Sequence, residues 1–260
     1  MTRTRFLVRV QDILGDTRLL WVPNAGDATT SLTDDPSART ITWDATVAAR
    51  LSVLGRGMTQ LFTAASSHSG SMPDTANMSF GDGTADSPVS FVVLGSPVNT
   101  AAARRFLTKY DQVGALREWG FGLSSTDLLN LICFDESGDI SVSRTSTAAI
   151  PMGAYHVYGA SYTGAGGATA MNGVTLTVDG AVVASSAVNN GSYVAMEDTT
   201  VTPRIGSFDV ATGQFMDGSL AMVAVAGRAL TTEQMLEITR LCRTFFGVRR
   251  DDVSAPRHSV

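Results

Sequence analysis

Lysine, cysteine and charged residues in general are scarce in this chain. Lys109 is the only lysine among 19 basic residues, a bias that we attribute to a GC-rich genome and not to chemistry at a site. Charged residues make up 17% of the 260 residues, and the net charge is -5. General affinity for a nucleic-acid backbone requires a basic surface, so nucleic acid is not an expected partner.

Long apolar runs are also missing. No segment has the length or purity of a membrane-spanning helix, so we expect no membrane insertion. The apolar run from Phe6 to Val8 is interrupted by Arg9, which leaves no signal-peptide core. Cys133 and Cys242 lie far apart inside apolar patterns, which favours reduced core thiols over a disulfide. With 44% hydrophobic residues, the chain is expected to fold as one globular domain.

Short runs of alternating apolar and polar residues, separated by Gly, Asp, Asn and Ser, occupy most of the chain. This pattern is typical of antiparallel strands joined by turns. In the clearest hairpin, Asp179 and Gly180 stand between two such runs and supply the positive φ angles of a tight turn. Residues 137–139 mark a second turn. The pattern predicts strands at residues 40–43, 60–63, 77–80, 89–94, 105–110, 118–123, 128–134, 140–144, 155–162, 173–178, 181–185, 204–208 and 218–226.

One helix is specified near the end of the sequence. Thr231 can cap its first amides and Gln234 stands at the reciprocal capping position, so the helix is predicted to begin at Thr232. Apolar residues then recur at spacings of three and four as far as Phe245, which gives one apolar face that must lie on the rest of the domain. Gly247 is expected to end the helix in a left-handed cap.

Five sequence pieces occur in an order that resembles laminin G and concanavalin A-like domains. They are Tyr155-His156-Val157-Tyr158, residues 174–178 with Asp179-Gly180, Arg204-Ile205-Gly206, Phe215-Met216-Asp217-Gly218-Ser219-Leu220 and Gly227-Arg228-Ala229-Leu230-Thr231. The resemblance implies an all-β jelly-roll sandwich of two antiparallel sheets with one C-terminal helix. It assigns residues 19–248 to the sandwich, 1–18 to an N-terminal extension and 249–260 to a C-terminal tail.

Catalytic patterns are not found. Glycanases of this fold carry a Glu-x-Asp-x-x-Glu run, because alternate residues of one strand must place two carboxyl groups on one face. None of the five glutamates has an Asp two residues later, and we interpret them as solvated surface groups: Glu118, Glu136, Glu197, Glu233 and Glu237. The chain is therefore predicted not to be an enzyme. Among the three histidines, His156 matches a structural histidine of the family, so a hydrogen-bonded structural role is expected.

Two kinds of ligand site are considered. Some laminin G modules bind Ca²⁺ at the rim of the sandwich through loop carboxylates, and the loop candidates here are Asp82, Asp111, Asp135 and Asp209. Calcium is the only cofactor considered. Aromatic side chains could stack on a sugar if they are exposed, although alternation places most of them in the core; these are Tyr155, Tyr158, Tyr162, Tyr193 and Trp119.

The expected function is that of a non-enzymatic structural protein of a bacteriophage virion, as a capsid decoration protein or a tail or fibre component. A virus released by lysis needs no signal peptide. The expected partners are other virion proteins, such as the major capsid protein or tail proteins, further copies of this chain and a host-surface glycan. The anchors expected to bind partners are Phe6, Leu7, Val8, Arg249 and Arg250. The alternatives are a carbohydrate-binding adhesin and a glycoside hydrolase of the same fold.

Overall fold

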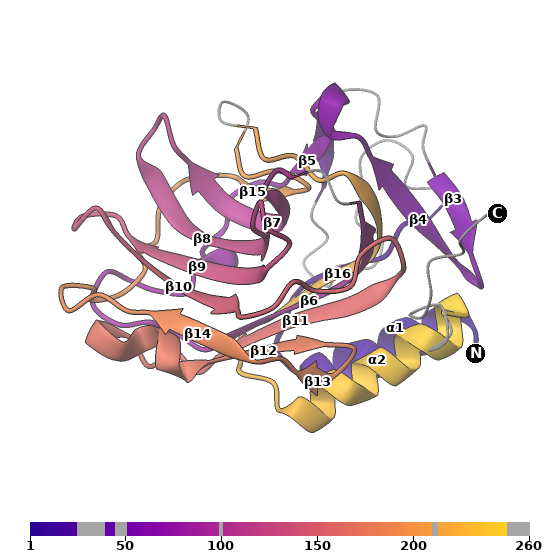
Figure 1. Cartoon of the computed structure of the whole chain (residues 1–260). Helices are drawn as coiled ribbons and strands as arrows, with labels where there is room; N and C mark the ends of the chain where they lie inside the picture. Colours follow the sequence, from indigo (N-terminus) through magenta and orange to yellow (C-terminus); the bar gives the residue numbers. More distant parts are fainter. Residues whose placement is uncertain (25–39, 45–50, 99–100, 210–212, 249–260) are drawn as a thin grey trace.

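Two antiparallel sheets face each other, and two helices cover the outer face of one of them (Figure 1). The structure is a computed structural model that describes residues 1–24, 40–44, 51–98, 101–209 and 213–248. This arrangement confirms the predicted β-sandwich with a C-terminal helix. No helix in these ranges is long and apolar enough to cross a membrane.

The first sheet lies between the helices and the second sheet. Its strands, in spatial order, are β13 (Ala181–Val182), β12 (Val174–Val178), β11 (His156–Tyr162), β6 (Val89–Pro97), β16 (Gly218–Ala226), β4 (Gly57–Phe62) and β3 (Leu51–Leu54). A further strand, β1 (Thr17–Trp21), pairs with the later half of β16, beyond the residues that pair with β4.

The second sheet forms the other side of the sandwich. Its spatial order is β14 (Ser185–Val188), β10 (Ile140–Ser146), β9 (Leu129–Asp135), β8 (Leu116–Leu123), β7 (Arg104–Asp111), β15 (Pro203–Ile205), β5 (Ser69–Ser71) and β2 (Thr42–Asp44). In the described part of the chain, short 3-10 helices lie in the connections: η3 (Ala64–Ser66), η4 (Ala76–Met78) and η5 (Gly167–Gly173).

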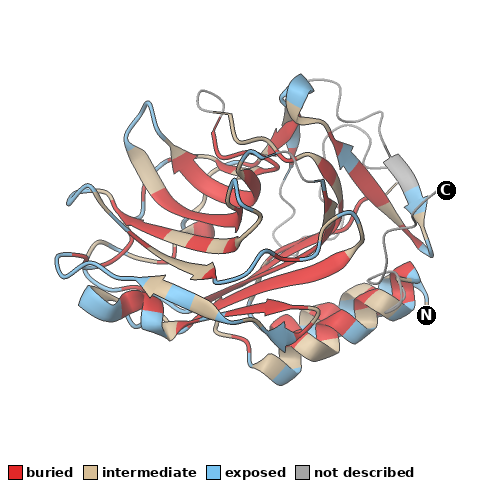
Figure 2. Cartoon of the chain, in the orientation of Figure 1, coloured by how far each residue is buried: buried red, intermediate tan, exposed pale blue. Residues whose placement is uncertain are grey.

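The main core fills the space between the sheets, where alternate residues of the facing strands meet (Figure 2). Phe91 of β6 contacts Trp119 and Phe121 of β8, with ring centroids 4.9 and 5.8 Å apart. The neighbours of Phe91 on the same strand, Val92 and Leu94, point the other way and pack beneath the helices. This explains why residues 89–94 show so little alternation: β6 is buried on both faces.

Helix α2 (Thr232–Phe246) is built as the sequence predicts. The side chain of Thr231 accepts a hydrogen bond from Gln234 N, and the Gln234 side chain accepts one from Thr231 N. Gly247 ends the helix with φ at +69°. The apolar face of α2, which includes Phe245, packs on the first sheet.

An N-terminal helix, α1 (Arg3–Leu14), was not predicted. Residues 1–18 were expected to be an extension outside the sandwich, yet the buried side chains of α1 belong to the core beneath the helices. Phe6 is fully buried, and its ring stacks on Phe245 of α2 at 4.5 Å between centroids. At the other end of α1, the Arg228 guanidinium donates hydrogen bonds to the carbonyl oxygens of Ile13 and Leu14, which satisfies two backbone groups that a helix end leaves open.

The predicted turns are present, whereas one predicted strand is not. Asp179 and Gly180 both have positive φ, 55° and 77°, as a tight two-residue hairpin turn requires. Residues 77–80 were expected to be a strand, but η4 occupies residues 76–78. There the carbonyl oxygen of Met78 accepts a hydrogen bond from Trp119 Nε1 at 2.9 Å, so its backbone is not available for a ladder.

The two cysteines are free thiols in different cores. Cys133 lies between the sheets and Cys242 lies beneath the helices, so the first sheet separates them. Burial raises the pKa of both thiols above the usual value. This agrees with the prediction of reduced core cysteines.

Candidate binding site

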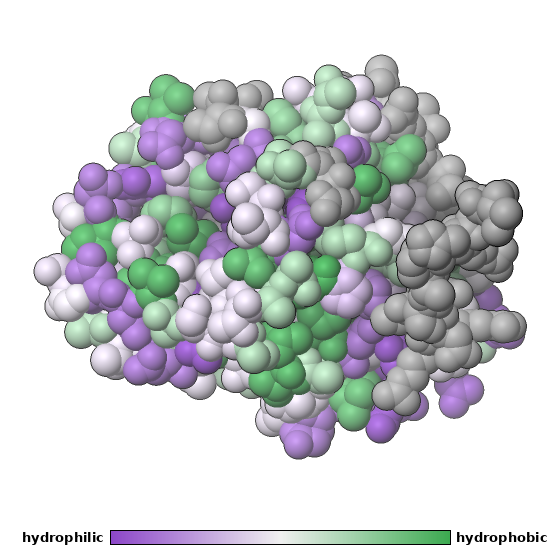
Figure 3. Space-filling view, in the orientation of Figure 1, coloured by the Kyte–Doolittle hydropathy of each residue, from purple (hydrophilic) through white to green (hydrophobic). Residues whose placement is uncertain are grey.

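A cleft of about 440 Å³ opens where strand β7 ends and β8 begins. The β7–β8 turn forms one side of it, and the segments that flank β15 form the other. Its lining combines hydroxyl, carboxylate and guanidinium groups with a few apolar side chains: Tyr110, Asp111, Val113, Leu116, Thr200, Val201, Thr202, Arg204 and Asp209. Figure 3 shows both polar and apolar side chains exposed at the left of the molecule, where the β7–β8 and β9–β10 turns lie.

A small aromatic cluster stiffens the wall of this cleft. Tyr110 stacks on Phe208 with ring centroids 3.6 Å apart, and Phe134 lies 5.1 Å from Tyr110. The guanidinium of Arg105 sits 4.6 Å above the Phe208 ring, and that of Arg117 sits 5.5 Å from the Phe134 ring. Burial raises the pKa of the Tyr110 hydroxyl, so this group stays protonated at neutral pH. All three rings are buried, so they support the cleft and do not offer an open stacking face.

The polar groups of the cleft are held by the turns around them. Asp111 Oδ1 accepts hydrogen bonds from the amides of Val113 and Gly114, at 3.0 and 3.1 Å, which closes the β7–β8 turn. Asp209 Oδ2 accepts one from Gln112 N at 3.1 Å. Thr200 is exposed and Thr202 is half-buried. The backbone on either side of these two threonines is held by hydrogen bonds, since Thr199 N donates to Glu118 Oε1 at 2.7 Å and the Pro203 carbonyl oxygen accepts from Met72 N at 2.9 Å.

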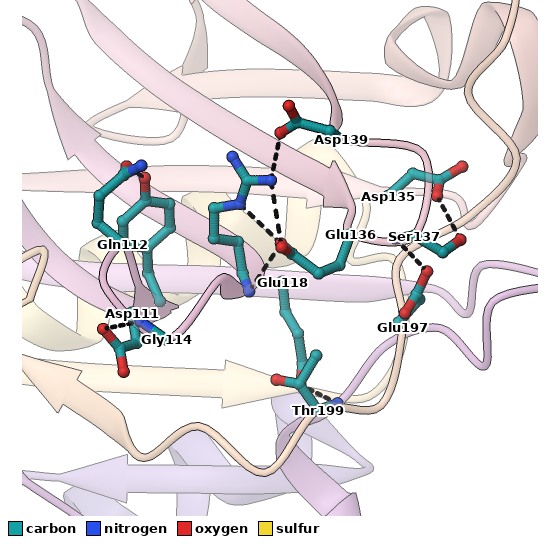
Figure 4. A network of polar contacts seen from close by, with 12 residues as sticks. Asp111, Gln112, Gly114, Glu118, Asp135, Glu136, Ser137, Asp139, Glu197 and Thr199 are labelled. Atoms are coloured by element: carbon teal, nitrogen blue, oxygen red, sulfur yellow. Dashed lines mark hydrogen bonds and ion pairs between the residues drawn. The ribbon is translucent and has the colours of Figure 1, made fainter.

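Beside the cleft lies a buried charged cluster that sequence reasoning missed. Lys109 and Glu118 are both fully buried, and Lys109 Nζ lies 2.7 Å from Glu118 Oε1. The same oxygen accepts hydrogen bonds from the amide and the hydroxyl of Thr199, at 2.7 and 2.8 Å (Figure 4). Burial raises the pKa of Glu118 to about 7, although the nearby Lys109 ammonium lowers it. The interpretation of Glu118 as a solvated surface group, and of Lys109 as uninformative, is therefore wrong.

A β-bulge accounts for the position of Glu118. Tyr110 of β7 pairs with Arg117 of β8, whereas the preceding Lys109 pairs with Trp119, so Glu118 is the extra residue. The neighbouring Arg117 turns to the β9–β10 side, where its Nε donates to Glu136 Oε2 at 2.7 Å (Figure 4). Glu136 therefore forms an ion pair with Arg117 and is not the solvated surface group that the sequence suggested.

Solved structures of the same architecture exist, although no family model and no curated protein matches the chain. The binding domain of Paraclostridial Mosquitocidal Protein 1 aligns with a TM-score of 0.60 at 10% identity, over 87% of this chain and 52% of that one. The receptor binding domain of botulinum neurotoxin D aligns with a TM-score of 0.59 at 10% identity, over 88% and 53%. This chain therefore spans about half the length of these two toxin domains.

A third similar structure matches along nearly its whole length. Domain 4 of AbnA, a GH43 extracellular arabinanase from Geobacillus stearothermophilus solved in complex with arabinotriose, aligns with a TM-score of 0.54 at 13% identity. The alignment covers 86% of this chain and 98% of that domain. At such identities the three structures show that the fold is shared, and function does not follow from fold alone.

The four calcium candidates divide between two places. Asp111 and Asp209 both line the cleft. Asp82 and Asp135 instead hold turns: Asp82 Oδ1 accepts from Thr84 and Ala85, which lowers its pKa to about 2, and Asp135 accepts from Gly138 and Val194. Within the described ranges, no three His, Cys, Asp or Glu residues are grouped so as to hold a metal ion. Calcium binding stays a prediction.

The aromatic residues considered for sugar stacking are almost all in the core. Trp119, Tyr158, Tyr162 and Tyr193 are buried, and Tyr155 is half-buried against the helices. The structural role expected for His156 agrees with the geometry, because its Nδ1 lies 2.8 Å from an Asp179 carboxylate oxygen.

The expected partner-binding residues are placed as follows. Phe6 is not available as an exposed anchor, because α2 covers it. Leu7 is half-buried at the edge of the helix layer, and Val8 is 49% exposed on the outer side of α1. Arg249 and Arg250 lie outside the described residues. Whether Leu7 and Val8 contact another protein stays a prediction.

Proposed function

We propose that this chain is a non-catalytic binding module that recognises a glycan at the cleft formed by the β7–β8 turn and the segments flanking β15. The observation that carries the proposal is the cleft itself. Its volume, about 440 Å³, falls within the range of small-ligand sites, and it combines hydroxyls, two carboxylates and a guanidinium on a rigid aromatic support. Such a set of donors and acceptors suits the hydroxyl groups of a sugar.

The comparisons support a binding role over hydrolysis. The similar structures include a domain in complex with arabinotriose and two binding domains of toxins. In the described part of the chain, the buried Glu118 forms an ion pair with Lys109 and accepts a hydrogen bond from Thr199 N. Glu136 forms an ion pair with Arg117. Neither of these two carboxylates lines the cleft, so neither is placed to act as the acid or the nucleophile on a sugar bound there.

The proposed setting is a bacteriophage virion, in which the sandwich is a rigid display module among capsid or tail proteins and further copies of itself. This part of the proposal rests on the sequence.

Glycan binding is tested by titrating the chain with arabino-oligosaccharides and with bacterial surface polysaccharides, using calorimetry and saturation-transfer NMR. For any glycan that binds, the double variant Thr200→Val and Thr202→Val is expected to bind more weakly. Two lost hydrogen bonds of about 1 kcal/mol each correspond to roughly a 30-fold rise in Kd. The matched control is Thr175→Val, which removes an exposed hydroxyl from β12 on the outer face of the first sheet.

Two results would contradict the proposal. One is the absence of binding to every glycan tested. The other is a glycan that binds the cleft variant as tightly as it binds the unchanged chain, because the ligand would then sit elsewhere.

A further inference from the structure

The only lysine of the chain is fully buried and is surrounded by oxygen atoms. Its Nζ lies 2.7 Å from Glu118 Oε1, 2.8 Å from Asp74 Oδ1 and 3.9 Å from Asp198 Oδ1. It also donates hydrogen bonds to Ser79 Oγ at 2.6 Å and to the Thr199 carbonyl oxygen at 2.9 Å. Three carboxylates around one amine are more than charge neutralisation requires.

We propose that Lys109 and Asp74 condense into an intramolecular isopeptide bond, and that Glu118 moves the protons of this reaction. The link would join the segment just before η4 to strand β7, across the end of the sandwich. It would be a covalent modification of the folded chain by its own side chains, independent of the proposed glycan binding.

The reacting atoms are already close. With Nζ 2.8 Å from Asp74 Oδ1 and a carboxyl C–O bond of about 1.2 Å, the carboxyl carbon lies within about 4 Å of the amine. Productive intramolecular reactions start from separations of roughly 3 to 3.5 Å, so a small side-chain movement is enough. Among the described residues, Asp74 Oδ1 has no hydrogen-bond partner, so its contact with the amine is not aligned as a hydrogen bond.

The reaction is balanced by the three side chains alone. The Glu118 carboxylate accepts one proton from the Lys109 ammonium, and the neutral amine then attacks the carboxyl carbon of Asp74. A C–N bond forms. Glu118 passes its proton to the departing Asp74 oxygen, and the second proton lost by nitrogen goes to the same oxygen. The C–O bond breaks, one water molecule leaves, and Glu118 returns to its starting state.

Glu118 is suited to this role by its environment. Burial raises its pKa to about 7, so it exchanges a proton readily near neutral pH. Its Oε2 is buried and, within the described part of the chain, has no hydrogen-bond partner. That atom is free to carry the proton. The condensation also replaces the fully buried ammonium, which is costly to keep out of water, by a neutral amide.

The other two carboxylates are less suited to accept the amine. Glu118 Oε1 accepts hydrogen bonds from Thr199 N and Thr199 Oγ1, which stabilise the ionised form and oppose attack on its carbon. Asp198 is farther from the amine, is half-exposed and accepts a hydrogen bond from Ser79 Oγ at 2.7 Å. The Asp74 side chain is 26% exposed, which leaves a route for the released water.

The composition fits this chemistry as well. Every other basic residue among the 19 is arginine, yet this position retains lysine. An arginine guanidinium cannot be deprotonated near neutral pH and could not act as the attacking nitrogen, whereas a buried lysine amine can.

The test is the mass of the whole chain, purified folded and then measured under denaturing conditions. We expect a mass lower by one water molecule than the sequence mass. Lys109→Arg and Asp74→Ala should restore the full mass, and Glu118→Gln should slow or abolish the loss. Asp198→Asn is the matched control, because it changes a carboxylate near the same amine and should leave the loss intact.

Tryptic digestion identifies the acceptor, because each carboxylate falls in a different peptide. Asp74 lies in residues 57–104, Glu118 in residues 118–144 and Asp198 in residues 145–204. A modified Lys109 blocks cleavage, so we expect peptide 106–117 joined to peptide 57–104. Full mass in the unchanged chain, or a link to another peptide, would overturn the proposal, and neither result requires that a variant folds.

Discussion

Replacing Phe6 by alanine should destabilise the whole domain, although Phe6 is only the sixth residue of the sequence. Its ring is fully buried, stacks on Phe245 at 4.5 Å and meets Phe246 edge-on at 5.6 Å. Truncation of a fully buried phenylalanine costs about 3 to 5 kcal/mol. For a domain of this size, 1 kcal/mol corresponds to roughly 2 to 4 °C in Tm, so Tm should fall by roughly 6 to 20 °C.

The assay is urea unfolding followed by circular dichroism, with thermal melts in parallel. Val8→Ala is the matched control, because Val8 lies on the same helix but is 49% exposed, and its loss should change the free energy of unfolding by less than about 0.5 kcal/mol. If Phe6→Ala and Val8→Ala unfold at the same urea concentration, α1 does not contribute to the stability of the sandwich. The attribution of the second core to both helices would then be wrong.

Two further variants test separate parts of the structure. Gly180→Ala should destabilise the chain by more than about 1 kcal/mol in urea unfolding, because φ at this residue is +77° and a Cβ would lie 2.5 Å from Leu236 Cα; the control Gly191→Ala, which has open space, should not. Since burial raises the pKa of Glu118 to about 7 in the folded chain, the folded state binds the extra proton, and stability should fall as the pH rises from about 4.5 to about 7. Glu118→Gln should flatten this part of the stability profile; an unchanged slope would show that Glu118 is not the titrating group.

The features that the sequence predicts well are those set by neighbours along the chain. The Asp179-Gly180 turn and the cap of α2 depend on residues within three or four positions of each other. Both can therefore be predicted from the sequence without knowledge of the fold. Helix α1 also has apolar residues at helical spacing, such as Phe6 and Val10. Its arginines led us to interpret the segment as an interrupted apolar run and not as a helix. Its packing on α2 joins residues that are more than 200 positions apart in the sequence, so this contact cannot be predicted from a local pattern.

The cleft could not be predicted for a related reason. Asp111 and Asp209 were selected one by one as loop carboxylates, and only the pairing of β7 with β15 brings their loops to one place. Thr200 and Thr202 could not be predicted as cleft residues, because threonines in loops have no distinctive sequence pattern.

The cleft and the lysine cluster are physically connected. The Glu118 oxygen that contacts Lys109 also accepts the amide and the hydroxyl of Thr199, and the next three residues line the cleft. Buried charges are costly unless every partner is in place, so this cluster permits one position of the segment that begins at Thr199 and penalises others. The presence of a single lysine in a chain whose other basic residues are arginine was therefore informative, although the residues around it in the sequence did not indicate why. Lys109 lies among three carboxylates, where a compact amine fits and a guanidinium does not.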